Sequence, residues 1–317
     1  MYTPLVSVII PSYNHSRFLN RRIESVLGQS YSNFEVIILD DCSTDNSREI
    51  IQEFVGREKI SGVVFNESNS GSPFKQWQKG IAMAKGEIIW IAESDDTADK
   101  YFLEKLIPHF VKDNDIGIVY CDSIIERDGV KLSQTFKGLK NNRFNTDRWS
   151  EDYYNSGLDE VSKYLLRFCT INNASAVLFR KAFLEEANPF DLNLKYIGDW
   201  YVYLKVCASY NIYYCSESLN YYSEHAQNTF SKILKNDAFV EENFKVFDWI
   251  YRAGLIEDRN LLNSEFFDKT RHSLVKNMSL EKLKMHGRLS LISPYLWVRL
   301  VLFNLYKPLK DRFLKLV

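Results

Sequence analysis

Along the first 120 residues, short runs of β-branched and other apolar residues alternate with stretches in which apolar residues recur at helical spacing. The apolar runs predict strands at Val6–Ile10, Phe34–Leu39, Val63–Phe65, Ile88–Ala92 and Ile116–Tyr120. The stretches between them predict helices at Phe18–Leu27, Ser47–Val55, Phe74–Ala84 and Ala98–Lys112. Continuously apolar strands that alternate with helices are typical of a parallel sheet covered on both faces. We therefore predict an α/β fold with a Rossmann-like, mostly parallel sheet flanked by helices.

The pattern weakens after this first part. Residues 123–172 are polar and aromatic with little periodicity, which predicts a loop-rich excursion. Regular structure returns with a predicted strand at Ala174–Phe179, a helix at Trp200–Ser209 and a strand at Ile212–Cys215. From about residue 232 onward the pattern is helical, so we expect a helical C-terminal extension.

Acidic residues follow the predicted strands where those strands end. The second strand runs into Asp40 and Asp41, the fourth into Asp95 and Asp96, and the fifth is followed by Asp122. In open α/β sheets, ligands bind beyond the carboxyl ends of the strands. Carboxylates gathered on one rim repel one another unless a positive charge lies among them, and a hard divalent cation suits oxygen ligands. The pattern therefore predicts a cation site on this rim.

Composition narrows the class of protein. The 317 residues carry a formal net charge of −1, which indicates no nucleic-acid partner bound through bulk charge. Five cysteines without a C-x-x-C pair favour a reducing compartment over a disulfide framework. The N-terminus reads as a first strand and not as a signal peptide. No stretch reaches the roughly 20 apolar residues that a membrane span needs, so we predict a cytoplasmic protein.

Two familiar phosphate-binding loops are missing. Neither the G-x-G-x-x-G fingerprint nor the P-loop pattern follows the first strand, where the segment PSYNHSRF stands instead. Backbone amides at the start of the first helix are therefore not expected to be the main phosphate-binding groups. Metal-bridged phosphate binding is the alternative that the acidic rim suggests.

Three segments in order, VSVIIPSYN, SVLGQSYSNFEVIILDDCSTDNS and GEIIWIAESDD, resemble the family 2 glycosyltransferases and their GT-A fold. The resemblance spans roughly residues 5–230. It implies a catalytic domain at residues 1–230, with a nucleotide-binding half at 1–122 and an acceptor-binding half at 123–230. Residues 231–317 would form the helical C-terminal region.

For the acidic pair in ESDD, the resemblance implies that Asp96 ligates Mn²⁺ or Mg²⁺, which bridges the donor diphosphate, while Asp95 lies near the ribose. The alternative is an acidic N-cap of the following helix. Asp41 matches the acid that holds the uracil or ribose in relatives, although Asp40 is adjacent and spacing does not separate the two. A turn that caps the next helix is the other interpretation of this segment.

Further donor contacts are implied at the end of the first strand, where relatives pack the base against positions that correspond to Pro11 and Tyr13. Tyr13 is equally explained as an aromatic residue on the rim. Residues 69–80, NSGSPFKQWQKG, depart from the pattern frequent in the family. Lys75 is our candidate there for the basic side chain that meets the nucleotide.

Asp199, in YIGDWYVYLKV, aligns with the catalytic base of inverting members of the family. Such a base removes the proton of the acceptor hydroxyl while that oxygen attacks C1 from the face opposite the diphosphate. An Asp directly before an apolar helix is also a good N-cap, and a cap lowers the carboxyl pKa. The two interpretations of Asp199 remain open at this point.

His225, in LNYYSEHAQNTF, resembles a segment near the end of the family's catalytic domain whose His reaches the metal or the diphosphate. A lone His is otherwise a structural or surface residue. The other four histidines have no such context, and no role is predicted for them. Asn173 stands where some relatives carry an acid on the acceptor side, and its amide could bond a sugar hydroxyl.

The last 30 residues, 288–317, carry six basic residues and one acid, a net of +5, among apolar and aromatic residues. Helical segments of this composition often lie in a membrane interface. Peripheral attachment to the inner face of the cell membrane is one prediction. A helix docked on the body or on a dimer partner, which would make an oligomer, is the other.

The resemblance implies an inverting, metal-dependent hexosyltransferase of a bacterial surface-polysaccharide pathway such as capsule or O-antigen assembly. The donor would be a nucleoside-diphosphate sugar, best a UDP-sugar, and the acceptor a glycan or a polyprenyl-linked sugar. A processive synthase is disfavoured because no Q-x-x-R-W segment follows Asp199. The alternative from another class is a catalytically inactive GT-A-fold protein that acts as a binding or scaffold protein.

Overall fold

The computed structural model describes residues 2–225 and 237–256. The chain divides into two compact units, Met1–Gln227 and Asn228–Val317. The domain boundary predicted at residue 230 falls outside the described residues, and so does the tail at 288–317. The proposed roles of that tail therefore stay predictions.

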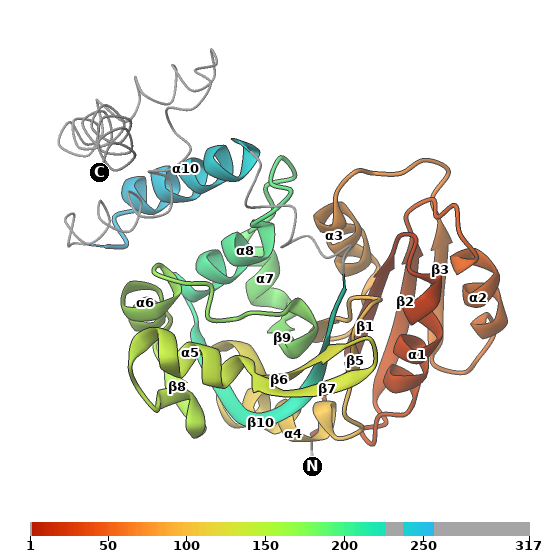
Figure 1. The fold of residues 1–317 in the computed structure, drawn as a ribbon, viewed down its shortest axis with the longest axis horizontal. Coiled ribbons are helices and arrows are strands. Elements are labelled where there is room, and N and C mark those ends of the chain that lie inside the picture. Colours follow the sequence, from red (N-terminus) through yellow and green to blue (C-terminus); the bar gives the residue numbers. More distant parts are fainter. Residues whose placement is uncertain (1, 226–236, 257–317) are drawn as a thin grey trace, which may run out of the picture. The chain divides into compact units, whose positions relative to one another are not determined.

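The first unit is built on one sheet whose order is β3-β2-β1-β4-β9-β6-β10-β5, with β7 beside β6 and β8 beside β10 (Figure 1). The strands are β1 (Val6–Ser12), β2 (Phe34–Asp40), β3 (Ile60–Phe65), β4 (Ile88–Ile91), β5 (Thr97–Ala98), β6 (Ile116–Arg127), β7 (Val130–Thr135), β8 (Tyr153–Asn155), β9 (Val177–Arg180) and β10 (Asn211–Glu224). Strands β1 to β4 pair in parallel, as do β6 and β10. Strand β9 lies antiparallel between the two groups. The predicted mostly parallel α/β sheet is confirmed.

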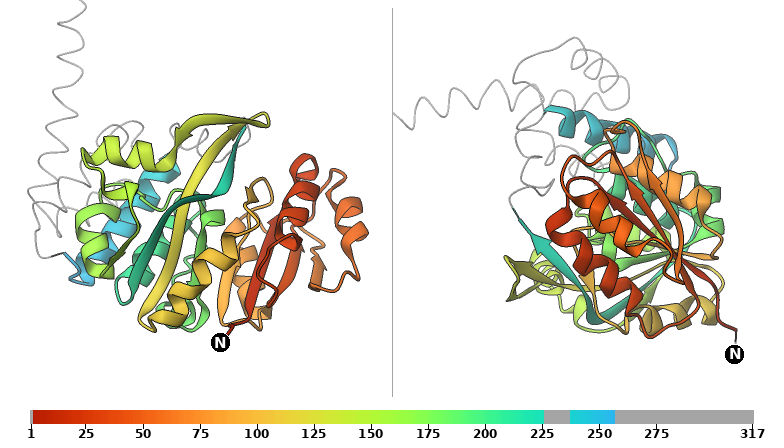
Figure 2. Two further views of the ribbon diagram at one scale, coloured as in Figure 1. Left: turned by 90° about the horizontal axis from the view of Figure 1, so that it is seen from below. Right: turned by 90° about the vertical axis from the view of Figure 1, so that its right-hand side faces the viewer.

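Helices cover both faces of the sheet (Figure 2). They are α1 (Ser16–Leu27), α2 (Ser47–Phe54), α3 (Pro73–Met83), α4 (Phe102–Lys112), α5 (Phe136–Phe144), α6 (Gly157–Glu160), α7 (Lys181–Ala187) and α8 (Gly198–Cys207). Successive strand residues point to opposite faces. Ile10 belongs to the core cluster that includes Leu19 of α1, whereas Ile9 faces α3. A Cβ at Gly80 of α3 would lie only 2.4 Å from Ile9 Cγ2, so this glycine lets α3 lie close against the sheet.

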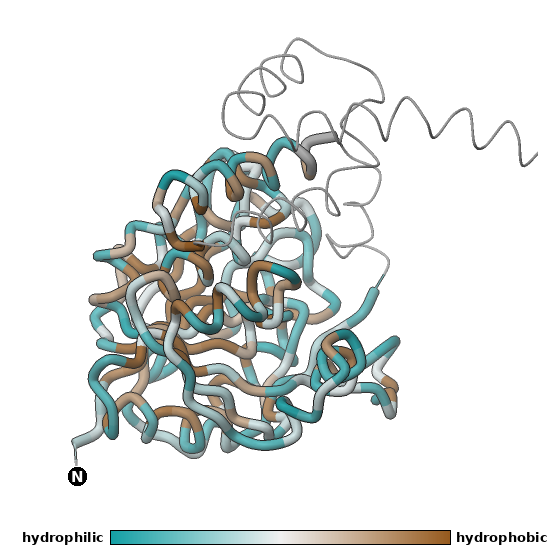
Figure 3. The backbone as a smooth tube through the Cα atoms, turned by 90° about the vertical axis from the view of Figure 1, so that its left-hand side faces the viewer, coloured by the Kyte–Doolittle hydropathy of each residue, from teal (hydrophilic) through white to brown (hydrophobic). Residues whose placement is uncertain are grey.

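Apolar stretches run through the interior of this unit while hydrophilic segments lie toward its outside (Figure 3). Strands β1 and β2 are buried along their whole length. This explains why their sequences read as continuous apolar runs without alternation.

The region 123–172 is more regular than its sequence indicates, so the prediction of a loop-rich excursion was wrong. Strand β6 continues to Arg127, and β7, α5, β8 and α6 follow it. Polar pairs stabilise this part: Arg148 lies 2.6 Å from the fully buried carboxylate of Glu160. Buried aromatic residues such as Trp149 complete the packing. Because paired polar groups replace apolar ones, the usual periodicity is absent.

Lys140 of α5 is buried, with 1% of its surface exposed, among aromatic rings. Its Nζ lies 4.7 Å from the ring centre of Tyr214 and 5.2 Å from that of Tyr120. Burial lowers the pKa of Lys140 to about 8, against the opposing pull of Asp122. The lysine therefore belongs to the interior of this half of the unit.

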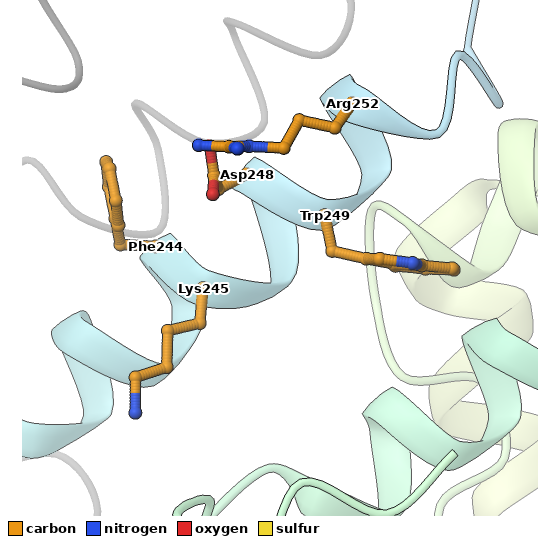
Figure 4. A pocket seen from close by; sticks show the side chains of 5 residues that line it. All are labelled: Phe244, Lys245, Asp248, Trp249 and Arg252. Atoms are coloured by element: carbon orange, nitrogen blue, oxygen red, sulfur yellow. The ribbon is translucent and has the colours of Figure 1, made fainter. Parts of the chain in front are cut away.

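In the second unit, the described residues form α10 (Asp237–Arg252). Five residues of this helix line a pocket: Phe244, Lys245, Asp248, Trp249 and Arg252 (Figure 4). Arg252 Nε pairs with Asp248 at 3.0 Å, one helical turn away. No residue named above as a candidate for catalysis or binding lines this pocket. Among the described residues, no helix has both the length and the apolar character that a membrane crossing requires.

Candidate active site

The ESDD segment follows β4 and leads directly into β5. The predicted helix start at Ala98 was wrong, because Thr97 and Ala98 form a strand that pairs antiparallel with Tyr221 and Asn220 of β10. α4 begins only at Phe102. This pairing brings the end of β10 beside the acidic segment, although more than 120 residues separate them in sequence.

Asp95 faces two histidines from distant parts of the chain. Its Oδ2 lies 3.0 Å from Nε2 of His225, which follows β10. One ring nitrogen of His15, one of His225 and one carboxylate oxygen of Asp95 all lie within 4.8 Å of one another. We call these three residues the His–Asp–His cluster. Such nitrogen and oxygen atoms are metal-ligand types, so this cluster can hold a divalent cation.

The rings around the cluster are held in place. The His225 ring stacks on Phe18 with 4.8 Å between ring centres. Nδ1 of His15 lies 2.7 Å from Oγ of Ser94. Burial lowers the pKa of His15, which favours the neutral imidazole that can bind a metal. For Asp95, burial acts to raise the pKa, but the hydrogen bond with His225 and the charges of both histidines outweigh it and lower the pKa.

Asp96 does not belong to the cluster and is 3% exposed, whereas the Asp95 side chain is 19% exposed. Asp96 Oδ1 accepts a hydrogen bond of 2.9 Å from the backbone N–H of Ser223, and Oδ2 accepts one of 2.9 Å from Nδ2 of Asn173. Burial, and then the charge of Asp95, raise the pKa of Asp96 to about 7. This carboxyl group therefore ties the ESDD segment to β10 and to the segment before β9.

Asn173 also caps the short 3-10 turn that follows it, because its Oδ1 accepts the N–H of Ser175 at 2.7 Å. With 6% of its surface exposed, its amide is occupied inside the protein. The predicted acceptor contact of Asn173 stays a prediction, and in this structure the side chain supports Asp96 instead.

Two further ionisable groups lie next to the cluster, the half-buried Glu93 and the buried Arg22. Glu93 accepts a hydrogen bond of 2.7 Å from the indole N–H of Trp77, and burial together with Asp95 raises its pKa to about 8. Arg22 of α1 is fully buried, and no described residue pairs with its guanidinium nitrogens. It lies over the Trp90 ring at 5.0 Å, and burial lowers its pKa to about 10. The positive charge of Arg22 interacts favourably with the carboxylates of Asp95 and Asp96 and partly compensates their negative charge.

His15 and Arg22 were missed for different reasons. His15 lies in PSYNHSRF, directly beyond the first strand, and this position on the rim was an available signal. Arg22 lies inside an amphipathic helix among other arginines. Nothing in its local sequence distinguishes a buried arginine from an exposed one.

Asp41 is buried and holds the segment after β3. Its Oδ1 accepts hydrogen bonds from Asn66 Nδ2 at 2.8 Å and Gln76 Nε2 at 2.9 Å. Its Oδ2 accepts the hydroxyl of Ser70 at 2.7 Å. The neighbouring Asp40 is instead paired with Arg48 Nε at 2.8 Å and is fully buried. The two adjacent acids thus have distinct surroundings.

The remaining predicted donor contacts surround the same end of the sheet. Pro11 is buried in β1, in register with Leu39 of β2, whereas Tyr13 is 45% exposed just beyond that strand. Lys75 is exposed, and its Nζ donates to the carbonyl of Ser70 at 2.8 Å. The structure brings Pro11 and Lys75 near the segments that flank Asp41.

Asp199 lies in the first turn of α8, whose N-cap is Ile197. It therefore does not occupy the N-cap position, although its Oδ1 accepts the N–H of Trp200 at 2.7 Å. The adjacent Gly198 packs on α3, where a Cβ would lie 2.4 Å from Phe74 Cε2. Phe74 in turn meets Trp77 edge-on, with ring centres 5.1 Å apart. Packing thus connects Asp199 to the ESDD segment through α3.

Known glycosyltransferases are similar to this chain in sequence. The profile of the family "Glycosyl transferase family 2" matches residues 7–176, more than half of the chain. A Nostoc glycosyltransferase is 26% identical over 92% of this chain and 89% of its own length. A Bacillus subtilis protein, the putative teichuronic acid biosynthesis glycosyltransferase TuaG, is 36% identical over 42% of this chain. The match spans about half of TuaG, 52%.

Solved structures share the fold. Staphylococcus aureus TarS in complex with UDP-GlcNAc superimposes with a TM-score of 0.66 over 90% of this chain and 80% of that chain, at 20% identity. TarS is a poly(ribitol-phosphate) β-N-acetylglucosaminyltransferase. A Pyrobaculum calidifontis mannosyltransferase in complex with GDP-Man and Mn²⁺ gives a TM-score of 0.60 at 15% identity, over 96% of this chain and 87% of that chain. The acidic segment beyond β4, the sheet that carries it and the family profile agree: this chain belongs to the family 2 glycosyltransferases and has the GT-A fold.

Proposed function

We propose that this protein transfers a sugar, with inversion, from a UDP-sugar to a glycan or polyprenyl-linked acceptor in the assembly of a cell-surface polysaccharide. One observation carries the proposal: Asp95 and His225 meet at 3.0 Å across the junction of β5 and β10. An oxygen and a nitrogen atom of metal-ligand type would then be available beyond the carboxyl ends of the strands, where open α/β sheets bind ligands. Two relatives support the choice of pathway: TuaG is named for teichuronic acid biosynthesis, and TarS is named as a poly(ribitol-phosphate) β-N-acetylglucosaminyltransferase.

The metal would be Mn²⁺ or Mg²⁺, held by Asp95 and His225. When bound, it neutralises charge on the departing diphosphate. The resemblance assigned the metal to Asp96, but that carboxyl group is buried and bonded to Ser223 and Asn173. Asp95 is more exposed and faces the histidine. We therefore assign the ligand role to Asp95 and give Asp96 the role of holding β10 in place.

The nucleotide would lie along the ends of β1 and β2. Asp41 is the better candidate for the base or ribose, because Asp40 is already neutralised by Arg48. Asp41 would exchange a bond with Ser70 or Gln76 for one with the ligand. Tyr13 is exposed beside this position, where its ring can cover the base. Lys75 follows Ser70 and would meet the phosphates or ribose.

Asp199 would act as the catalytic base. It takes the proton of the acceptor hydroxyl, the freed oxygen forms a bond to C1 of the donor sugar, and the bond from C1 to the diphosphate oxygen breaks. The electron pair of that bond leaves with UDP. A base positioned this way contributes about 10²–10⁴-fold in rate. Its place in the first turn of α8, half-buried, supports this role because it is not the helix N-cap.

The acceptor would bind over residues 123–225, with Asn173 as a candidate contact. A polyprenyl-linked acceptor would place the enzyme on the inner face of the cell membrane, where the basic segment 288–317 would contact anionic lipid. These parts of the proposal rest on the composition of the tail and on the names of the relatives.

The experiment that tests the proposal uses the full chain. Binding of UDP and UDP-sugars is measured by calorimetry with Mn²⁺, and UDP release is followed with membrane extracts as acceptor. Asp199→Asn is expected to lose at least about 100-fold in UDP release while UDP binding is retained. The exposed Asp115→Asn, outside the proposed donor and acceptor regions, serves as control and should behave as wild type.

An inactive binding or scaffold protein is the rival, and it predicts donor binding without turnover in any variant. Wild-type turnover in Asp199→Asn would remove the base assignment. Failure of every nucleoside diphosphate to bind the wild-type protein would remove the proposed function.

A further inference from the structure

The residue that remains unexplained in the candidate site is His15. It lies between β1 and α1, where it is the residue before the first turn of α1. One of its ring nitrogens is within 4.8 Å of ligand atoms of both Asp95 and His225. The His15 and His225 rings are nearly perpendicular, at 88°, with centres 6.0 Å apart.

We infer that His15 is a third protein ligand of the metal, and that two imidazoles make this site select first-row transition cations over Mg²⁺. The inference rests on the proposed function, because it concerns the metal of the same donor site. Imidazole nitrogen suits transition metals, whereas Mg²⁺ is held mainly by oxygen ligands and water. A cluster of two nitrogens and one oxygen therefore favours Mn²⁺, Co²⁺ or Zn²⁺.

The separations within the cluster suit one cation. At metal–ligand distances of about 2.1 Å, two ligands on adjacent coordination positions lie about 3 Å apart, and two on opposite positions lie about 4.2 Å apart. Asp95 Oδ2 and His225 Nε2 are 3.0 Å apart. One ring nitrogen of His15 lies within 4.8 Å of the ligand atoms of both Asp95 and His225, an upper bound close to the separation of two ligands on opposite positions.

The backbone that carries His15 is fixed by the segment after β2. Asn14, at φ 54°, donates its N–H to Ser43 Oγ at 3.0 Å, and its side-chain oxygen accepts the N–H of Thr44 at 2.7 Å. The N–H of Ser16 donates to Asp45 at 3.0 Å. These bonds flank His15 on both sides and hold it on the rim.

The His15 ring is also oriented by a partner of its own. Nδ1 bonds to Oγ of Ser94, which is 1% exposed and lies inside the ESDD segment. Metal-binding histidines characteristically use one ring nitrogen for such an orienting bond and the other for the metal. Ser94 leaves Nε2 as the nitrogen that can bind the cation.

The test measures metal binding to the full chain without nucleotide or acceptor. Mn²⁺ binding is followed through the electron paramagnetic resonance signal of free Mn²⁺, and excess Mg²⁺ is then added as competitor. Wild type is expected to bind Mn²⁺ and to keep it against Mg²⁺. His15→Ala and His15→Gln should each weaken Mn²⁺ binding by at least about tenfold and reduce the preference for Mn²⁺ over Mg²⁺.

His109→Asn is the matched control, because His109 lies on α4 with its ring stacked on Tyr213 and belongs to no metal cluster of the described residues. It should bind Mn²⁺ as wild type does. Circular dichroism identifies any variant that fails to fold. His15→Gln is the more conservative variant, because its amide can still form a hydrogen bond with Ser94. Asp95→Asn should abolish binding.

The outcomes separate this inference from the proposed function. Unchanged Mn²⁺ affinity and unchanged metal preference in both folded His15 variants would overturn the inference, while donor turnover would leave the proposed function intact. Selective Mn²⁺ binding that depends on His15, in a protein that binds no nucleoside diphosphate, would support the inference and remove the proposed function.

Discussion

The backbone N–H of Ser223 donates a hydrogen bond of 2.9 Å to Oδ1 of Asp96. This bond joins the ESDD segment to the last residues of β10, two positions before His225. Strand pairing between β5 and β10 continues in the same direction through Tyr221 and Thr97. Asp96 therefore fixes the strand end that carries His225 to Asp95, and under the proposed function the two adjacent acids would divide structural and ligand roles between them.

This division predicts different effects of the same substitution at the two acids. Asp96→Asn should lower the free energy of unfolding by about 1–3 kcal/mol. Both oxygens of Asp96 accept from N–H groups, and the NH₂ group of Asn would face one of these donors and lose that hydrogen bond. Asp95→Asn should fold with near-normal stability but lose the stabilisation that Mn²⁺ gives. Thermal melts with and without Mn²⁺ measure both effects. A stable Asp96→Asn that no longer responds to Mn²⁺ would return the ligand role to Asp96.

The contact of Gly198 with Phe74 predicts that α8 tolerates no side chain at this position. Gly198→Ala should displace Phe74 or the start of α8, because the new Cβ would lie 2.4 Å from a ring carbon. We expect a loss of about 1–3 kcal/mol in stability and a lower kcat, since Asp199 is the next residue.

Gly138→Ala is the control, because a Cβ there meets nothing within 4 Å. The double variant Gly198→Ala/Phe74→Leu should recover part of the stability by making room. Full activity and stability in Gly198→Ala alone would show that the contact is not restrictive. Calorimetric melts and initial rates of UDP release give the comparison.

The buried positive charge of Arg22 predicts weaker binding of a metal cation at the site. Its buried charge favours the ionised acids of the site in the absence of metal, and it opposes a bound cation. Arg22→Met should therefore strengthen Mn²⁺ binding by on the order of 1 kcal/mol and enlarge the Mn²⁺-induced rise in Tm. Arg21→Met, on the same helix but with an exposed side chain, is the control. Weaker Mn²⁺ binding in Arg22→Met would contradict the countercharge role.

Lys140 predicts a pH dependence of stability. Its folded-state pKa of about 8 lies below the ordinary value of 10.5, so between these pH values the unfolded chain holds more protons. The free energy of unfolding therefore rises with pH across this window, by at most about 3 kcal/mol from this group. Below pH 8 both states are charged and the burial penalty is constant. Lys140→Met should lack this rise.

The measurement is urea denaturation at pH 7.5 and pH 9.5, taken as the wild-type change minus the variant change. Subtraction removes the contribution of tyrosines and other groups that titrate in both proteins. Lys112→Met, at an exposed position of α4, should retain the rise. The charged or titratable groups that act on Lys140 are Asp122, Cys121, Glu160 and Arg148. An equal rise in Lys140→Met would assign the effect to one of them.

The sequence by itself determined the parallel half of the sheet and the helices that cover it. Strands such as Val6–Ser12 are buried on both faces, so their apolar runs are continuous and easily distinguished from helical spacing. It also located the acidic segments at the ends of β2 and β4, because the boundary of a buried strand is visible as an abrupt change from apolar to acidic residues.

The helices and strands of region 123–172 could not be predicted from the sequence pattern. Its helices and strands are stabilised by paired polar groups, such as Arg148 with Glu160, and by aromatic packing around Trp149. Pairing of distant polar residues leaves no periodic signal in the local sequence, so the region read as loop.

Only the tertiary structure decided how the site is assembled. Whether Asp95 or Asp96 faces the two histidines depends on the backbone direction at two successive residues, which spacing does not encode. The meeting of His15, Asp95 and His225 depends on the ends of β1, β4 and β10 converging, the last through the β5–β10 pairing. Local patterns fix what each segment forms, whereas long-range pairing fixes which side chains meet, because those contacts join residues far apart in the chain.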